Sequence, residues 1–434
     1  MEEEKGLKKV LLAIILVFTP VVCDAGELYE ITLPEAIEYV KKNSPKLMIK
    51  RMDVEIAKNN IQKANRLNNP SLTSATNIAK AGDGNPQQLV VSELFEIAKR
   101  HPRKKLALSE YELSQRNLEL GAFDLRMNVR EAYINLVGAK TILKVVKEQK
   151  DLISELRELA EKKFAQGLAN EMDIFQTKIA LNQLAIEQNS AEVNVNNSIT
   201  EFNRVVYRKD ADYNSTEGVF ADNYSALLVP PPSINLPSLE VLLDTYLANC
   251  FDIKIARQKI DIAEKNLTNV IRKRVPDVAL TGGWEYQEKF RSASGGFHSG
   301  GFAGISLVNI PLLYTYKPEI KNAKIVLEQA NLKYDSEVNE AVKTIASAYD
   351  SFNTAKANLN EYNNQLVSNS YILMKYAKEN YEAGKSDLIS LIVMEKCYKE
   401  INIGYTLALV EYSKTWTDLL RALNIDEMSG LELL

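Results

Sequence analysis

The segment "DVALTGGWEYQ", residues 277–287, alternates between two kinds of side chain. In an extended chain one face would carry an apolar series that ends in aromatic residues, namely Val278, Leu280, Gly282, Trp284 and Tyr286. The opposite face would be small or polar. About ten residues of such alternation, bordered by aromatic side chains, are typical of a β-strand that crosses a membrane. The sequence therefore predicts a transmembrane strand, with Trp284 and Tyr286 at the membrane interface.

Three further segments of similar length have strand character: "SLTSATNIAK" (71–80), "QQLVVSELFEI" (87–97) and "GFAGISLVNIP" (301–311). Glycine-containing turns separate the first two from each other and the last from residues 277–287. Four strands are too few to close a barrel, and lipid tolerates no open sheet edge, so several chains would have to contribute. Three chains would supply about twelve strands. The alternative is a pair of soluble hairpins that cap a helical rod.

Two long stretches of the chain contain no proline, from Arg103 to Val229 and from Glu319 to the end. An interior proline costs a helix about 3 kcal/mol, so such stretches suit long helices. Apolar residues recur at alternating steps of four and three, from Leu118 to Val146 and again from Val338 to Leu366. This spacing is typical of a coiled-coil seam, and a soluble coiled-coil rod would show it too. A helix over residues 103–166 would be roughly 95 Å long.

One glycine interrupts each long helical pattern. Gly384 lies within "YEAGKSDLISLIVME" (381–395), and Gly167 occupies the corresponding place in the first half. Polar residues and a new apolar period follow each glycine, which is favoured where a chain leaves helical geometry. The sequence predicts that both are reversals, so that each half of the chain forms a helical hairpin.

The two halves of the chain resemble each other. Residues 33–72 align with residues 239–278 at an offset of 206, and further along the offset is 216 to 217, as for Tyr133 and Tyr349. We interpret this as an ancient duplication, an internal two-fold repeat. The predicted organisation is a first repeat over 26–206 with a hairpin at about 103–206, a linker over 207–237, and a second repeat over 238–434 with a hairpin at about 319–424.

The N-terminus has the order of a secretory signal. Lysines precede the apolar run "VLLAIILVFTPVV", and small residues follow it. We predict a signal peptide over residues 1–25, cleaved after Ala25. The apolar run is too short to span a bilayer and contains Pro20. Acylation of Cys23 is an alternative fate for this segment. The mature protein is therefore expected to be exported.

Composition excludes several classes of function. The chain has 53 basic and 57 acidic residues, which gives no electrostatic support for binding nucleic acid. With only two histidines and three cysteines, no metal-ligand or disulfide framework is visible. No nucleophile–base cluster or glycine-rich phosphate loop occurs. We therefore expect no catalytic, cofactor or metal site, and no enzyme.

Several segments together carry a family resemblance: "ITLPEAIEYVKKNSPKLM", "VSELFEIAKRHPRKKLA" and "YEAGKSDLISL". With these pieces in this order and at duplicated spacing, the chain resembles the TolC family of outer-membrane efflux proteins over essentially its mature length. The second piece is similar to the branch that serves heavy-metal resistance pumps. That branch often has Gly-Lys-Arg where this sequence has Ala98, Lys99 and Arg100.

The resemblance implies a mainly α fold with a membrane β-barrel portion. In a homotrimer, long antiparallel coiled-coil helices would form a hollow α-barrel in the periplasm. Four strands per chain would contribute to a twelve-stranded barrel in the lipid of the outer membrane. The function implied is the outer-membrane channel of a tripartite efflux system. It would passively conduct substrates expelled by an inner-membrane pump, expected to be of the RND type, through a periplasmic adaptor (membrane fusion) protein. The alternatives are a channel of type I protein secretion and a periplasmic coiled-coil structural protein.

The resemblance also places the hairpin tips at the periplasmic mouth of the tunnel. Family members commonly have aspartates six and nine residues after the second tip glycine, where this chain has Ser390 and Val393. Asp387 follows Gly384 by three residues, and Asp173 follows the first tip glycine by six. We predict that Asp173 and Asp387 supply the negative potential of the mouth. Alternatively, both cap helices or face solvent.

Overall fold

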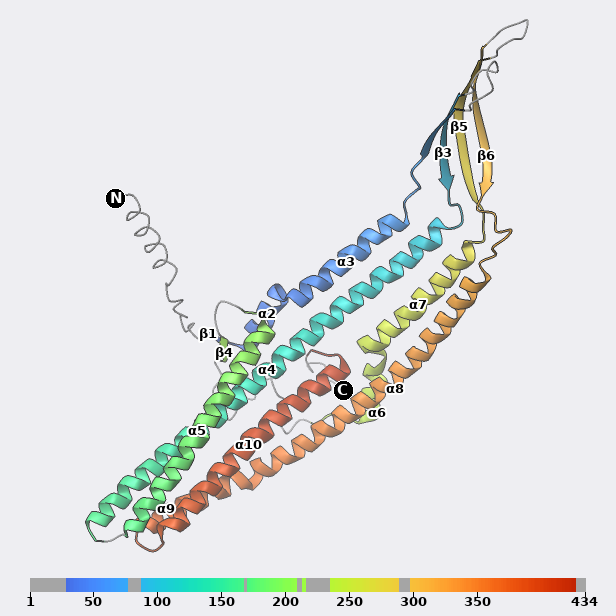
Figure 1. Cartoon of the computed structure of the whole chain (residues 1–434). Helices are drawn as coiled ribbons and strands as arrows, with labels where there is room; N and C mark the ends of the chain where they lie inside the picture. Colours follow the sequence, from blue (N-terminus) through green and yellow to red (C-terminus); the bar gives the residue numbers. More distant parts are fainter. Residues whose placement is uncertain are drawn as a thin grey trace, which may run out of the picture.

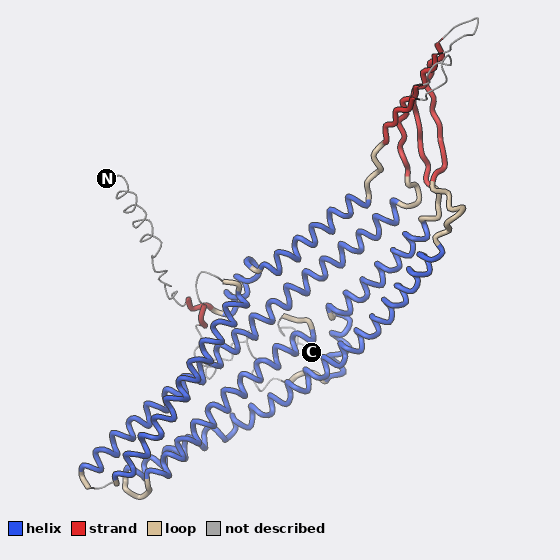
Figure 2. Tube along the Cα trace, in the orientation of Figure 1, coloured by secondary structure: helices blue, strands red, loops and turns tan. Residues whose placement is uncertain are grey.

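The structure is a computed structural model that describes residues 29–76, 87–167, 170–208, 213–215, 235–288 and 297–426. The predicted signal peptide, Cys23 and most of the predicted linker lie outside these residues. The described chain is a long bundle of helices with a small sheet at one end, and at the other end the chain reverses direction after α4 and after α9 (Figure 1). Figure 2 shows that the strands of this sheet gather at a single end.

The first half of the chain runs from the N-terminal strand to the end of the first hairpin. Its elements are β1 (Tyr29–Ile31), α2 (Leu33–Asn43), α3 (Pro45–Ala64), β2 (Ser71–Thr76), β3 (Gln87–Phe95), α4 (Arg100–Ala165) and α5 (Glu171–Val206). Helix α4 has 66 residues, which corresponds to a length of about 100 Å. Helix α5 runs back beside it (Figure 1).

The second half has the same succession of strands and helices. Its elements are β4 (Tyr213–Ser215), α6 (Leu239–Tyr246), η1 (Leu247–Asn249), α7 (Phe251–Arg272), β5 (Asp277–Glu288), β6 (Phe297–Val308), α8 (Lys317–Glu361), η2 (Tyr362–Leu366), α9 (Val367–Glu382) and α10 (Leu388–Leu423). The segment η2 is a π-helical turn where the apolar spacing indicated an unbroken helix. Tyr362 packs there so closely on Gly404 of α10 that a Cβ on the glycine would lie 2.6 Å from the tyrosine hydroxyl oxygen.

Two strands have ends that differ from those predicted from the alternation of side chains. Strand β3 ends at Phe95 instead of residue 97, and β6 covers Phe297–Val308 instead of 301–311. Asn309 ends β6 because its φ is +58°, a left-handed conformation that cannot continue a strand. The alternation of side chains predicts that a strand exists, but it does not predict its last residue. The last residue is determined by the backbone angle of the residue that follows.

A second, smaller sheet was not expected. Strand β4 lies inside the region predicted as linker and pairs in parallel with β1. The backbone N–H of Tyr213 donates to Asn203 Oδ1 at 2.7 Å, and the Tyr213 ring lies edge-on to Tyr39. Three residues are too few to show alternation, so this pairing depends on contacts with distant segments.

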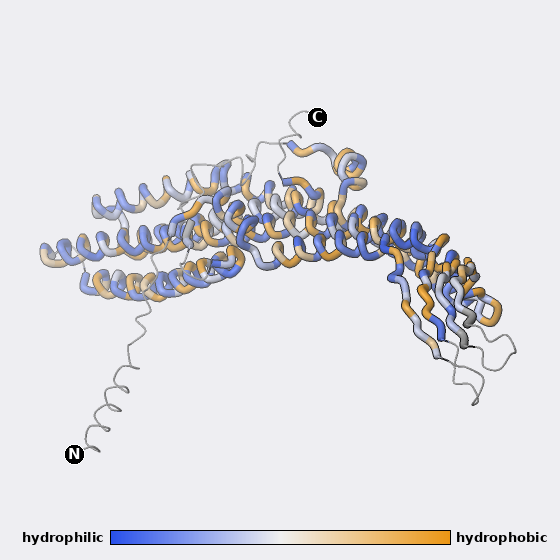
Figure 3. Tube along the Cα trace, turned by 90° about the horizontal axis from the view of Figure 1, so that it is seen from above, coloured by the Kyte–Doolittle hydropathy of each residue, from blue (hydrophilic) through white to orange (hydrophobic). Residues whose placement is uncertain are grey.

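The main core lies where α4, α5, α8 and α10 meet. Its largest fully buried side chains include Tyr133, Phe202, Phe352 and Tyr412. The middle of each predicted seam is buried, as Leu125, Val129 and Leu136 of α4 and Ile345, Phe352 and Leu359 of α8 show. Leu366, the last position of the second predicted seam, lies in the π-helical turn and is 43% exposed. Figure 3 shows hydrophobic and hydrophilic residues interspersed along the helices. None of the described helices combines the length and the hydropathy needed to cross a membrane.

Candidate functional site

The four-stranded sheet has one apolar face. Its strands are antiparallel in the order β2-β3-β5-β6, with Leu89 opposite Trp284 and Leu280 opposite Ile305. Directly opposed residues share a face of the sheet. The face so defined carries Leu72, Leu89, Val91, Phe95, Val278, Leu280, Trp284, Ile305 and Leu307. Leu72 and Ile305 are 70% and 77% exposed, so this apolar face is uncovered in the single chain.

The opposite face of the sheet is mainly small or polar. It carries Thr73, Ser92, Thr281, Glu285 and Ser306, and its large apolar residues are Val90, Leu94 and Phe302. Trp284 and Tyr286 both belong to the apolar face, and Trp284 is 55% exposed. Their position at a membrane interface stays a prediction. Glu93, opposite Leu280, is the charged exception on the apolar face. A sheet with one apolar face and one mainly small or polar face suits a wall between lipid and water.

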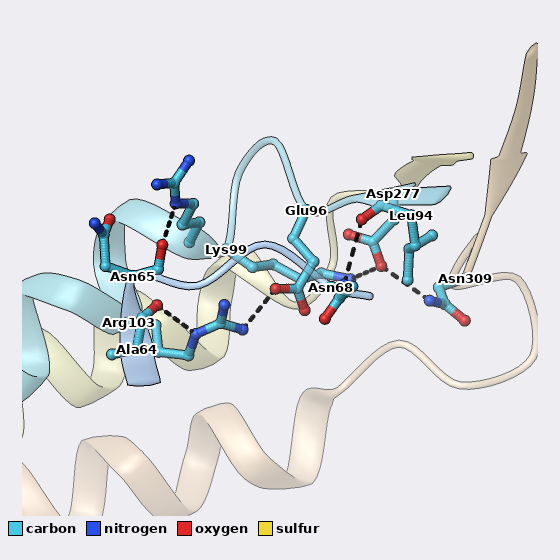
Figure 4. Close-up of polar contacts among 10 residues, drawn as sticks. Ala64, Asn65, Asn68, Leu94, Glu96, Lys99, Arg103, Asp277 and Asn309 are labelled. Carbon is cyan, nitrogen blue, oxygen red and sulfur yellow. Dashed lines mark hydrogen bonds and ion pairs between the residues drawn. The ribbon is translucent and has the colours of Figure 1, made fainter. Parts of the chain in front are cut away.

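A buried ion pair joins the two halves below the sheet (Figure 4). Lys99, between β3 and α4, places its Nζ 2.6 Å from Asp277 Oδ2 at the first residue of β5. Asn309 Nδ2 donates to the same oxygen at 2.9 Å. Only 3% of the Asp277 side chain and 14% of the Lys99 side chain are exposed. The carboxylate therefore connects the segment before α4 with both strands of the second half.

A second set of polar contacts holds the end of α3 against the start of α4. Arg103 Nη1 lies 2.6 Å from Glu96 Oε2, and Arg103 Nε donates to the Ala64 carbonyl at 2.9 Å (Figure 4). Arg100 Nε donates to the Asn65 carbonyl at 2.8 Å. Backbone carbonyls at a helix end lack intrahelical partners, and these arginines satisfy them. The position of the sheet on the helices thus depends on polar contacts.

At the other end of the molecule, a glycine ends the incoming helix of each hairpin. Gly384 has φ +71°; its N–H donates to the Tyr381 carbonyl, and the Lys385 N–H donates to the Asn380 carbonyl at 2.8 Å. This pair of bonds is the Schellman motif, which satisfies carbonyls of the last turn. Gly167 has φ +73°, and its N–H donates to the Phe164 carbonyl at 2.9 Å. A Cβ would meet nothing within 4 Å at either glycine, so the backbone angle alone selects glycine.

Replacing Gly384 by alanine is expected to lower the free energy of unfolding by about 1–2 kcal/mol, the cost of a left-handed residue with a Cβ. Asparagine tolerates this conformation better, so Gly384→Asn is the matched control with a smaller loss. Chemical denaturation of the detergent-solubilised protein, followed by circular dichroism, measures both variants. Equal stability of wild type and Gly384→Ala would show that the residue does not need a positive φ.

The two candidate acids of the mouth have different surroundings. Asp387 is the N-cap of α10, where its Oδ1 accepts from the Ser390 N–H at 3.2 Å and from the Ser390 hydroxyl. Both hydrogen bonds lower the pKa of Asp387, and the one from the Ser390 hydroxyl has the larger effect. Asp173 lies in the first turn of α5. Burial raises the pKa of Tyr381 at the end of α9, and the negative charge of Asp173 on the other hairpin raises it further.

Sequence reasoning missed a contact between the two hairpins at their tips. Lys163 Nζ donates to the Tyr381 carbonyl at 2.6 Å and lies 4.1 Å from the centroid of the Tyr381 ring. A small apolar cluster surrounds this contact: Ile153, Leu156, Ala160, Leu184, Tyr381, Leu388 and Leu391. No sequence signal links residues 218 positions apart. The contact ties the last turn of α4 to the last turn of α9.

A carboxyl group is buried behind the tips. Glu395 of α10 is 0% exposed, and Gln149 Nε2 of α4 donates to its Oε2 at 3.0 Å. Burial raises the pKa of Glu395, while the hydrogen bond from Gln149 and the charge of Lys378 oppose this increase. Nearby on α10, Lys399 Nζ lies 2.6 Å from Glu187 Oε2 of α5. The hairpins are thus joined by polar contacts as well as by the apolar cluster.

The Glu395→Gln variant is expected to be more stable than the wild type at neutral pH. The pKa of Glu395 is higher in the folded protein than its ordinary value of 4.5. The protonated carboxyl therefore stabilises the fold fully at pH values below 4.5, and this stabilisation is lost as the pH rises through the pKa of the folded state. Glutamine stays neutral and should remove this part of the pH dependence. Chemical denaturation at a series of pH values measures the free energy of unfolding of both proteins. Glu119→Gln, on the exposed surface of α4, is the control. Parallel profiles for wild type and Glu395→Gln would contradict the expectation.

The fold defines a class of protein in which long helical hairpins carry a small amphipathic sheet. Residues 242–392 match the family model described as outer membrane efflux protein. No curated protein sequence matches the chain. Among solved structures, the fold is similar to a membrane protein from Pseudomonas aeruginosa, with a TM-score of 0.71, 16% identity and coverage of 94% of each chain.

Two other similar structures are named channel or outer-membrane proteins. The CmeC outer membrane channel of Campylobacter jejuni has a TM-score of 0.68 at 17% identity, over 90% of this chain and 85% of that chain. The outer membrane protein VceC of Vibrio cholerae has a TM-score of 0.67 at 16% identity, over 90% and 95%. At such identities the likeness establishes the fold.

The matched family and the fold agree with the resemblance noted in the sequence. Residues 242–392 form an outer membrane efflux protein domain, and the whole chain has the fold of the TolC-like channels. Proteins of this family are channels of the outer membrane that extend into the periplasm, and they are not enzymes. Membership of the heavy-metal resistance branch stays a prediction.

Proposed function

We propose that three copies of the chain form one continuous tunnel, with a twelve-stranded barrel in the outer membrane and a hollow α-barrel in the periplasm. The observation that carries this proposal is the sheet. It has an uncovered apolar face, and within the described residues β2 and β6 are its two edge strands. Lipid tolerates no unpaired backbone edge, whereas β6 of one copy can pair with β2 of the next until the sheet closes.

The helices support the same assembly. Helix α5 carries a stripe of exposed apolar side chains at near-heptad spacing: Met172, Phe175, Ile179, Ile186 and Val193, each more than half exposed. Helix α9 exposes Tyr371, Leu373 and Tyr376. An uncovered seam of this kind is stable in water only when another helix covers it. A homotrimer would place the helices of a neighbouring copy against these stripes.

In this assembly the chain serves a tripartite efflux system. An inner-membrane pump of the RND type would expel the substrate, and a periplasmic adaptor would dock at the hairpin tips around Gly167 and Gly384. The arrangement also fits a duplicated chain, with repeats over 26–206 and 238–434 separated by the linker 207–237. Each half contributes two strands and one helical hairpin to the tunnel.

Purification and planar-bilayer recording test the assembly directly. We expect the detergent-extracted protein to have the mass of a trimer and to conduct ions when it is reconstituted into a bilayer. A monomer that leaves the bilayer impermeable would contradict the proposal. A species found free in the periplasm, without detergent, would favour the coiled-coil structural alternative.

Removing the charges of Asp173 and Asp387 together is expected to reduce the cation preference of the channel. Asparagine caps helices as well as aspartate does, so Asp387→Asn removes the charge and keeps the cap. Single-channel reversal potentials in a salt gradient measure the preference. Asp335→Asn, at an exposed position of α8 far from the tips, is the matched control. An unchanged preference in the double variant would reject these acids as the source of the potential.

A further inference from the structure

The loop between β6 and α8 exposes an unusual amount of apolar surface. Leu313 is 102% exposed and Leu312 80%, and Ile310 and Tyr314 on either side are about half exposed. The loop lies at the base of the sheet, where strands give way to helices (Figure 1). Single exposed apolar residues are common on proteins, but a contiguous group indicates a surface that something else covers.

This loop is held in place by its polar groups. Arg274 Nε donates to the Thr315 carbonyl at 2.9 Å, and the Tyr314 hydroxyl donates to Glu319 Oε2 at 2.6 Å. The rings of Tyr314 and Tyr316 are edge-to-face, with centroids 5.2 Å apart. The apolar side chains of Leu312 and Leu313 are therefore presented by an anchored loop.

The first half of the chain exposes an apolar residue at the equivalent place. Ile97 precedes Leu313 by 216 positions, as Pro102 of α4 precedes Pro318 of α8. Ile97 is 71% exposed, although β3, which it follows, is paired on one side with β2 and on the other with β5. The exposure of Ile97 is thus not caused by a missing neighbouring strand. Leu313 follows β6 as Ile97 follows β3. Pairing of a second copy with β6 would therefore leave Leu313 exposed, just as pairing on both sides of β3 leaves Ile97 exposed.

The apolar face of the sheet leads directly to these residues. Phe95 lies on that face, and Ile97 follows it by two positions, with its N–H donating to the Phe95 carbonyl at 3.1 Å. Leu307 lies on the same face shortly before Ile310. The band of apolar side chains therefore continues below the strands, where tyrosines and basic residues such as Arg274 and Lys317 join it. This mixture suits the boundary between acyl chains and phosphate headgroups.

We propose that Ile97 and the loop over residues 310–314 bind the phospholipid leaflet that faces the periplasm and so set the depth of the channel in the membrane. In a trimer the two loops of each chain would surround the base of the barrel. The apolar side chains enter the acyl region, and the tyrosines and basic residues contact the headgroups. This inference rests on the proposed orientation of the sheet in the membrane and assigns a lipid contact outside the strands.

Fluorescence quenching by brominated lipid tests the contact. The full chain with Leu313→Trp is reconstituted into phosphatidylcholine vesicles whose acyl chains carry bromine close to the headgroup, and its quenching is compared with that of wild type, which has two tryptophans. Leu312→Trp is an independent second probe. Ile305→Trp, on the apolar face of β6, is the positive control. Leu332→Trp, an equally apolar and 64% exposed position farther along α8, is the negative control.

We expect the added tryptophan at 312 or 313 to be quenched as strongly as that at 305, with no added quenching at 332. Quenching at 305 but at neither 312 nor 313 would overturn the lipid contact and leave the proposed channel intact. No quenching at any of these positions would instead contradict the insertion of the sheet. Equal quenching at 332 and 313 would overturn the assignment of the loop to the membrane boundary.

Discussion

Replacing Lys99 by alanine is expected to lower the free energy of unfolding by about 3–5 kcal/mol, because the change leaves a buried carboxylate without its countercharge. The side chain of Asp277 is only 3% exposed, and its Oδ2 would keep only the hydrogen bond from Asn309. The loss should also loosen the sheet from the helices, since this ion pair joins the two halves at their junction. Chemical denaturation of the detergent-solubilised protein measures the free energy.

Two further variants make the result specific. Arg204→Ala breaks the exposed ion pair with Glu201, which should cost far less because solvent screens the two charges. The double variant Lys99→Met, Asp277→Leu removes both buried charges and should be clearly more stable than Lys99→Ala alone. If Lys99→Ala costs no more than Arg204→Ala, the ion pair does not hold the junction.

Replacing Phe352 by alanine is expected to cost about 3–5 kcal/mol, because the cavity forms in the middle of the main core. Phe352 is 1% exposed, and its ring stacks on Tyr412 at 5.1 Å and lies against Trp416 at 5.2 Å. These contacts join α8 to α10, the two long helices of the second hairpin. Thermal and chemical denaturation should both show the loss.

The matched control is another phenylalanine at a different depth. Phe164, near the end of α4, is 44% exposed, so Phe164→Ala removes far less buried area and should cost much less. Phe352→Leu keeps most of the volume and should fall between the wild type and Phe352→Ala. Similar losses for Phe164→Ala and Phe352→Ala would show that the stacked rings do not form the centre of the core.

The long helices and the existence of the strands could be predicted because their signals are local. Seam positions such as Val129 and Ile345 recur at helical spacing, and both are buried in the structure. The alternation around Trp284 likewise predicts a strand without reference to any other segment. The π-helical turn at Tyr362 could not be predicted, since it depends on the fit of a ring against Gly404 of another helix.

The candidate site was accessible from sequence only in part. The acids Asp173 and Asp387 could be located by their distance from the tip glycines, and helix capping was an alternative role for both. Only the structure shows that Asp387 is the N-cap of α10, whereas Asp173 lies within the first turn of α5. The contact of Lys163 with Tyr381 and that of Gln149 with Glu395 were missed. Their partners are 218 and 246 positions apart, and no local pattern marks a residue for a contact at that distance.

The sequence by itself determined the elements of this protein: helices from apolar spacing, strands from alternation, and reversals from Gly167 and Gly384. These properties depend on neighbouring residues and on backbone angles, which the chain specifies locally. Only the tertiary structure decided that β3 pairs with β5, which brings the two halves into one sheet and Lys99 onto Asp277. Such pairing depends on the free energy of contacts between distant segments, and any one segment of the sequence is compatible with many partners.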